Sequence, residues 1–224
     1  MDVVASQMVS QIARLVLVET EVVDVVLPQE YFYKSLPLAL IDAVFSIGVT
    51  YKSTQNTVER FCQNQCPEWA LYRSDQGPER TLADLLAVAN GWQPSELAAN
   101  VYGNRQRTSS RNGILKAEAV TRCAVILRNH GVERFSDAHL LHDNPELDRD
   151  FRLVPGQISG ISLGYFKMLC GDDNGIKHDR HIQAFMTRHG IASIAVLKAI
   201  ARELEISPRV LDYAIWQKMS RTGT

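Results

Sequence analysis

The chain has 224 residues, of which 46% are hydrophobic and 22% are charged, values that argue against a disordered or fibrous protein. Its formal net charge of −1 shows no overall basic character, so nucleic-acid binding would need a local basic surface. The sequence has no run of about 18 uncharged apolar residues and no secretory signal pattern, so we expect a cytoplasmic protein without a membrane partner.

Helical periodicity extends over almost the whole chain. In residues 3–26 apolar side chains recur at a spacing of about 3.6, and Pro, Gly, Ser and Thr occur where further helices would begin or end. No segment of useful length alternates with period two. The sequence therefore predicts an all-α protein, with helices over residues 3–26, 36–48, 55–65, 81–90, 95–102, 114–130, 136–142, 158–170, 179–189, 193–205 and 208–219.

Four cysteines occur, and only Cys62 and Cys66 are close in sequence. Their C-x-x-x-C spacing does not fit a zinc knuckle. One helical turn would place both side chains on the same face, where they are expected to be small buried apolar residues. No metal site is predicted.

The segment 103–113, "GNRQRTSSRNG", holds three arginines among small polar residues: Arg105, Arg107 and Arg111. Such a loop can contact the phosphates of a nucleic acid, or it can simply be a solvated loop. The residues alone leave both interpretations open.

The segment 154–160, "VPGQISG", predicts a turn between two helices. The first N–H groups of the second helix lack intrahelical acceptors and can bind a phosphate, and a glycine allows close approach of the backbone. A Pro-Gly turn can also do no more than reverse the chain. The candidate phosphate ligands here are Pro155, Gly156, Gln157, Ser159 and Gly160.

Asp179 stands where a new helix is predicted to begin, among Lys177, His178, Arg180 and His181. Aspartate is a favoured N-cap, so a purely structural role explains it. Alternatively, the nearby cations keep a functional carboxylate ionised, so that it can stabilise a cationic sugar transition state or orient a water.

Three segments, in this order along the chain, resemble the helix-hairpin-helix DNA glycosylase superfamily, which includes endonuclease III and the adenine-mismatch glycosylases. "LPLALIDAVFSIGVTYKSTQNTVERF" is similar to the family's early helix and the loop that faces the flipped base. The helix that starts at Lys116-Ala117-Glu118 is similar to the one that leads to the hairpin. Pro155-Gly156 match the Leu-Pro-Gly-x-Gly hairpin, and Asp179 follows at the family's spacing of about two dozen residues.

The resemblance implies a two-lobed helical fold with a cleft between the lobes, residues 31–175 forming one lobe and residues 1–30 with 176–224 the other. DNA is the implied partner, its target base is flipped out of the duplex, and Asp179 is the implied catalytic residue. Gly48, Tyr51 and Lys52 are implied at the base pocket. The implied DNA contacts are the five hairpin residues, Lys167, Lys177 and the three loop arginines. A monomer is expected, associated with the nucleoid if the protein is bacterial.

The chain also departs from the family pattern. Ile158 replaces the second hairpin glycine, and residues 158–162 lack the lysine with which lyase members form a Schiff base. No cysteine follows Cys170, so no iron–sulfur cluster is implied; the only implied cofactor is the monovalent cation that backs the hairpin in many relatives. We therefore expect a monofunctional glycosylase for a damaged or modified base, in repair or in defence against modified foreign DNA. The alternative is a non-catalytic helix-hairpin-helix protein that binds DNA or a partner.

Overall fold

A computed structural model describes residues 3–65 and 69–222, and it confirms the all-α class. Within these ranges no β-strand forms, and the only extended pairings are two isolated bridges, Tyr33 with Tyr72 and Arg107 with Leu115. The chain divides into two compact units. We call residues 29–171 the hairpin unit, and residues 1–28 with 172–224 the terminal unit.

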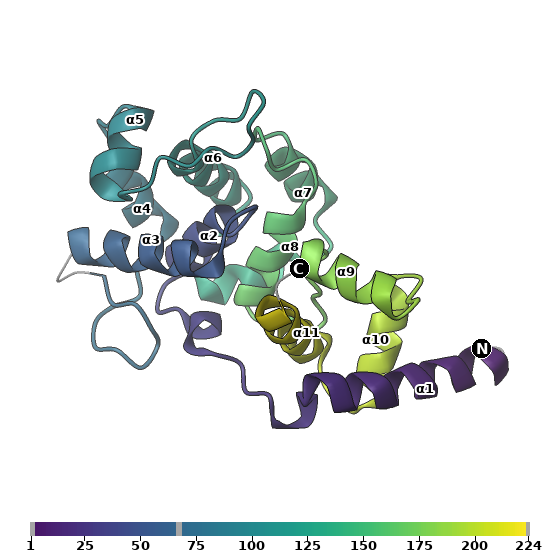
Figure 1. Cartoon of the computed structure of the whole chain (residues 1–224). Coiled ribbons are helices and arrows are strands. Elements are labelled where there is room, and N and C mark those ends of the chain that lie inside the picture. Colours follow the sequence, from purple (N-terminus) through teal and green to yellow (C-terminus); the bar gives the residue numbers. More distant parts are fainter. Residues whose placement is uncertain (1–2, 66–68, 223–224) are drawn as a thin grey trace. The chain divides into compact units, whose positions relative to one another are not determined.

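The hairpin unit is built around α2 (Leu36–Phe45), whose ten residues are all buried. This helix contacts α3 (Tyr51–Asn64), α4 (Leu82–Ala89), α6 (Lys116–Asn129) and α8 (Ile161–Leu169) (Figure 1). The other elements of the unit are η2 (Gln29–Phe32), α5 (Pro94–Glu96), η3 (Leu97–Val101), η4 (Phe135–Leu141) and α7 (Pro145–Arg152). A helix that is apolar on all sides has to be enclosed by others, and "LPLALIDAVF" is such a helix apart from Asp42.

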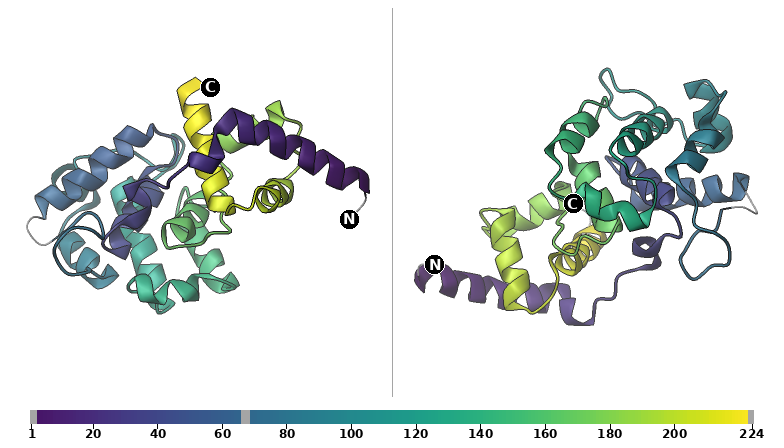
Figure 2. Two further views of the ribbon diagram at one scale, coloured as in Figure 1. Left: turned by 90° about the horizontal axis from the view of Figure 1, so that it is seen from below. Right: turned by 180° about the vertical axis from the view of Figure 1, so that it is seen from behind.

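The terminal unit joins the beginning and the end of the sequence around a single core. Its elements are α1 (Val3–Thr20), η1 (Val22–Asp24), α9 (Arg180–Arg188), α10 (Ile194–Glu203) and α11 (Pro208–Thr222). α1 packs against α10 and α11, and α11 packs against α9 (Figure 2). The apolar core includes Ile12, Val16, Phe185, Leu197, Ile200, Leu211 and Ile215.

Several predicted helix bounds need correction; the second helix ends at Phe45 and the last extends to Thr222. The first helix ends at Thr20 rather than at 26, because Glu21 takes a left-handed conformation with φ of 51°. The third begins at Tyr51, where the extended Thr50 precedes it. The helix expected from residue 158 begins at Ile161, because Gly160 has φ of 71°.

One helix, α7, was missed altogether. Its start carries a recognisable signal, since Asn144 is the N-cap and Pro145 occupies the first turn. The side-chain oxygen of Asn144 accepts a hydrogen bond from the N–H of Leu147 at 3.0 Å. Leu147 and Phe151, one turn apart, are buried.

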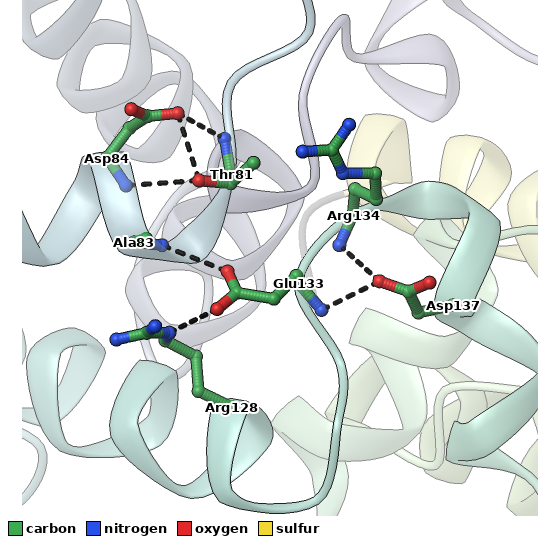
Figure 3. A network of polar contacts seen from close by, with 7 residues as sticks. All are labelled: Thr81, Ala83, Asp84, Arg128, Glu133, Arg134 and Asp137. Carbon is green, nitrogen blue, oxygen red and sulfur yellow. Dashed lines mark hydrogen bonds and ion pairs between the residues drawn. The ribbon is translucent and has the colours of Figure 1, made fainter.

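A polar network fastens α4 to the segment after α6 (Figure 3). Thr81 and Asp84 form a capping box at the start of α4. Glu133 accepts a hydrogen bond from the N–H of Ala83 at 3.1 Å and pairs with Arg128 of α6. These contacts position α4 and α6, two of the four helices that contact α2.

A buried lysine caps the C-terminal end of α2. Lys116 is only 2% exposed, and its ammonium group donates to the carbonyl oxygens of Phe45 at 2.8 Å and Ile47 at 2.7 Å. It also donates to the side-chain oxygen of Gln106 at 3.3 Å. Because the last carbonyls of a helix have no intrahelical donor, Lys116 serves as a C-terminal cap supplied by a distant helix.

We expect Lys116→Met to destabilise the protein by about 2 kcal/mol, because it leaves buried carbonyls unsatisfied while relieving the burial of a charge. Chemical denaturation followed by circular dichroism measures this loss. Lys167→Met is the matched control, since Lys167 is bound near the surface by a single carboxylate. Equal losses for the two variants would contradict a capping role for Lys116.

Candidate functional site

The hairpin of residues 153–160 connects α7 to α8, so a helix–turn–helix arrangement is present. Within the turn, the N–H of Gln157 donates to the carbonyl of Val154, and that of Gly160 donates to the carbonyl of Gln157, both at 2.9 Å. The N–H groups of Gly156, Ile158 and Ser159 make no hydrogen bond within the described part of the chain. The turn therefore has backbone donors available for an anion or for water.

Gly156 is required by a close approach of the loop 103–113. It has φ of 88°, and a Cβ atom added there would lie 2.3 Å from Cβ of Thr108 and 3.2 Å from its carbonyl oxygen. Any other residue at this position would collide with that loop. The contact joins two of the predicted DNA-binding segments into one surface.

Two other hairpin residues have structural partners. Gln157 is buried, and its side-chain oxygen accepts a hydrogen bond from the hydroxyl of Ser162, so this side chain is directed to the interior rather than to a ligand. At Gly160 an added Cβ would meet the guanidinium group of Arg152, which donates to the carbonyl oxygen of Ile158 at 2.9 Å. The side chain of Ile158 itself is 81% exposed.

The loop 103–113 exposes Arg105, Arg107 and Arg111. Among the described residues, none of the three guanidinium groups forms an ion pair with a carboxylate. Arg107 donates from Nε to the carbonyl oxygen of Gly113 at 2.9 Å, which orients its side chain without neutralising it. Three uncompensated positive charges therefore lie on the loop that contacts the hairpin turn.

This loop is also fastened to the start of α3. The side-chain amide of Asn104 donates to the hydroxyl of Thr57 at 2.8 Å, and that of Gln106 donates to the hydroxyl of Ser53 at 3.1 Å. The hairpin, the arginine loop and the first turns of α3 are thus connected within one unit. We call these three segments the hairpin surface.

Lys167 lies on α8, and its ammonium group pairs with Asp148 of α7 at 2.8 Å. The ion pair joins the two helices of the hairpin. Lys167, which the resemblance implies as a DNA contact, is therefore already paired with a carboxylate of the protein. Sequence spacing gave no sign of this partner, which lies 19 residues away.

The predicted base-pocket residues surround the start of α3. Lys52 is exposed, Gly48 has φ of 71° with open space where a Cβ would lie, and Tyr51 is half-buried. The hydroxyl of Tyr51 lies 3.5 Å from Oδ2 of Asp42, to which Tyr33 donates at 2.8 Å.

Asp42 is fully buried, and it was not among the residues predicted for the site. Burial, and next the negative charge of Asp42, raise the pKa values of Tyr33, Tyr51 and Tyr165 well above their ordinary range. These hydroxyl groups therefore stay protonated and can act as hydrogen-bond donors. The available signal was a single acid inside the apolar run "LIDAVF".

Asp179 belongs to the terminal unit, where it is the N-cap of α9. Its Oδ1 accepts hydrogen bonds from the N–H groups of His181 at 2.9 Å and Ile182 at 3.3 Å. The side chain remains 20% exposed, and Nδ1 of His181 lies 3.8 Å from Oδ1. Burial lowers the pKa of His181, although the charge of Asp179 acts in the opposite direction.

A second carboxyl group, that of Asp212 on α11, was also absent from the predicted residues. It is 4% exposed, and its Oδ1 accepts a hydrogen bond from the N–H of Lys177 at 2.8 Å. Burial, assisted by the charge of Asp179, raises the pKa of Asp212 to about 8. As with Asp42, the available signal was one acid within an apolar helical run, here "VLDYAIW".

The described residues offer neither a metal-ligand cluster nor a membrane span. No three His, Cys, Asp or Glu side chains come together there in a group that could hold a metal ion. No helix there is long and apolar enough to cross a membrane. Cys62 is buried, whereas Cys66 lies outside the described residues.

Gly156→Ala tests the close approach at the hairpin. Its control is Gly91→Ala, because Gly91 has a similar φ of 83° but open space where the Cβ would lie. We expect the control to cost about 1–2 kcal/mol of unfolding free energy from backbone strain, and Gly156→Ala to cost a further 1–3 kcal/mol or so from the collision with Thr108. Denaturant melts measure both losses, and equal losses would contradict the close approach.

Comparison with known proteins gives a family but no relative of known activity. No curated protein matches the chain, and no solved structure matches it either. The family described as "Domain of unknown function (DUF8548)" matches residues 10–220, nearly the whole chain. The protein therefore belongs to the DUF8548 family.

Proposed function

We propose that this protein is a monofunctional DNA glycosylase, which hydrolyses the N-glycosidic bond of a damaged or modified base flipped out of DNA. The observation that carries the proposal is the hairpin surface, where free backbone N–H groups and three unpaired arginines belong to connected segments. This combination suits the phosphates of a nucleic-acid strand.

The hairpin surface supplies the binding step. Backbone N–H groups at Gly156, Ile158 and Ser159 can donate to the oxygens of one phosphate. Arg105, Arg107 and Arg111 add long-range attraction to neighbouring phosphates, which a chain with a net charge of −1 needs at a local site. Gly48, Tyr51 and Lys52 are our candidates for contacts to the flipped base.

Asp179 supplies the chemical step in this proposal. Its Oδ1 is used in capping α9, whereas its Oδ2 makes no hydrogen bond within the described part of the chain. A carboxylate held in this way can stabilise the oxocarbenium character of the deoxyribose as the glycosidic bond breaks. The same oxygen can orient the attacking water or accept its proton.

We propose hydrolysis rather than a lyase reaction because no lysine at the hairpin is suited to form a Schiff base. None occurs in residues 158–162, and Lys167 is paired with Asp148. A Schiff base needs a free neutral amine, which neither position offers. The proposed substrate is either a chemically damaged base or a modified base in foreign DNA.

A second candidate is a DNA-binding protein without catalytic activity. The observation that favours it is the N-cap role of Asp179, since two hydrogen bonds to α9 are by themselves a sufficient reason for an aspartate there. The two candidates share the hairpin surface and differ only in whether Asp179 acts on a sugar.

Replacing Arg105, Arg107 and Arg111 together with Ala should weaken duplex binding. It should also reduce the slope of log K against log salt concentration by about 0.9 for each phosphate that the variant no longer neutralises. Fluorescence anisotropy of labelled DNA at several salt concentrations measures both effects. Arg134→Ala, an exposed arginine outside the loop, is the control. An unchanged slope in the triple variant would remove the loop from the interface.

Asp179→Asn tests the chemical step, because Asn caps a helix about as well as Asp and leaves α9 intact. The protein and this variant are incubated with duplexes that carry damaged or modified bases, and abasic sites are then cleaved with alkali. We expect strand breaks with the unaltered protein and a loss of at least about 100-fold in the variant.

The same reactions separate the two candidates. DNA binding without strand breaks on any duplex would favour the non-catalytic protein. Treatment with borohydride should trap no covalent complex, and a trapped adduct would overturn the hydrolytic mechanism.

A further inference from the structure

Asp212 occupies an unusual position for an acid. It lies on α11 between Leu211, which is fully buried, and the core residues Ala214 and Ile215. A carboxyl group in such a place is retained at a cost unless it makes a specific contact. That contact is the hydrogen bond that its Oδ1 accepts from the N–H of Lys177 at 2.8 Å.

That hydrogen bond fixes the short turn that carries Asp179. The N–H of Asp179 donates to the carbonyl oxygen of Lys177 at 2.6 Å, and Asp179 then caps α9 through its side chain. Asp212 holds Lys177, and Lys177 holds the backbone of Asp179. The buried carboxyl group is thus connected through Lys177 to the backbone of Asp179.

We infer that Asp212 is a positioning residue for Asp179, which it reaches through the backbone of Lys177. The catalytic meaning of this inference rests on the proposed function, whereas the structural link between the two residues does not.

The pKa of Asp212 is consistent with its burial near Asp179. Burial raises the pKa of Asp212 to about 8; the N–H of Lys177 opposes the shift, and the charge of Asp179 adds to it. At neutral pH Asp212 therefore holds a proton.

Several charged groups on the elements packed against α11 are paired or exposed, and Lys198 of α10 is partly buried. Glu19 of α1 pairs with Arg188 and His189, and Glu203 of α10 accepts a hydrogen bond from Ser10. Asp24 of η1 is exposed. On α11 itself, Arg209 pairs with Asp173. Lys177 and Asp179, with His181 beside it, are left as the charges that act on Asp212.

The raised pKa of Asp212 predicts that its contribution to stability falls as the pH rises. A carboxyl group whose pKa is higher in the folded than in the unfolded state binds its proton more tightly when folded. Its contribution to stability is therefore complete below the unfolded pKa of about 3.9. That contribution is lost as the pH rises towards about 8. Asp212→Asn keeps a side-chain oxygen for Lys177 but cannot ionise, so its melting temperature relative to the unaltered protein should rise steadily from about pH 5 to about pH 8.5.

The decisive measurement is the titration of the Asp carboxyl carbons by NMR in the unaltered protein, Asp212→Asn and Asp179→Asn. We expect one carboxyl to titrate near pH 8, to vanish in Asp212→Asn, and to move to lower pH in Asp179→Asn, where the neighbouring charge is absent. A high titration that persists in Asp212→Asn, or that does not move in Asp179→Asn, would overturn the inference.

Activity measurements test whether Asp212 affects the rate of base release. Asp212→Leu removes the acceptor for Lys177 at similar volume, so it should lower the rate of base release by roughly 10- to 100-fold. Asp212→Asn should recover most of this loss and should also shift the alkaline side of the pH–rate profile. Equal rates for Leu and Asn would overturn the positioning role. If no base is released by any form of the protein, the proposed function fails, while the NMR titration still tests whether the charge of Asp179 acts on Asp212.

Discussion

Several parts of the hairpin unit depend on the ammonium group of Lys116. It is buried under the end of α2, where it binds the carbonyl oxygens of Phe45 and Ile47 and the side chain of Gln106. One charged group therefore closes the central helix and fixes the loop of residues 103–113. Since that loop also contacts Gly156, the shape of the hairpin surface depends on a lysine that is not itself exposed on it.

The helical class was readable from the sequence because apolar spacing near 3.6 is a local property, repeated in almost every segment. The boundaries were less readable. Glu21 ends α1 through a left-handed conformation that side-chain type does not predict, and α7 was missed although Asn144-Pro145 is a good starting signal. Its short amphipathic face, formed by Leu147 and Phe151, was too brief to stand out.

In the candidate site, too, local features could be predicted from the sequence and long-range contacts could not. Asp179 as a helix N-cap could be predicted, because capping depends on the next three residues. The pairing of Lys167 with Asp148 and the contact of Gly156 with Thr108 could not, because each depends on segments that meet only in the folded chain. Asp42 and Asp212 are intermediate cases. An isolated acid in an apolar helix signals a buried polar contact, but it does not name the partner.

The terminal unit also bears on the order of events during synthesis. Ile12 and Val16 on α1 are made early, and their core partners Leu197 and Leu211 leave the ribosome only after the whole hairpin unit. Until then the apolar face of α1 has no native cover, and non-local contacts of this kind form slowly. The hairpin unit is one continuous stretch of chain, so it can fold first. The nascent chain is therefore expected to form the hairpin surface before the unit that carries Asp179.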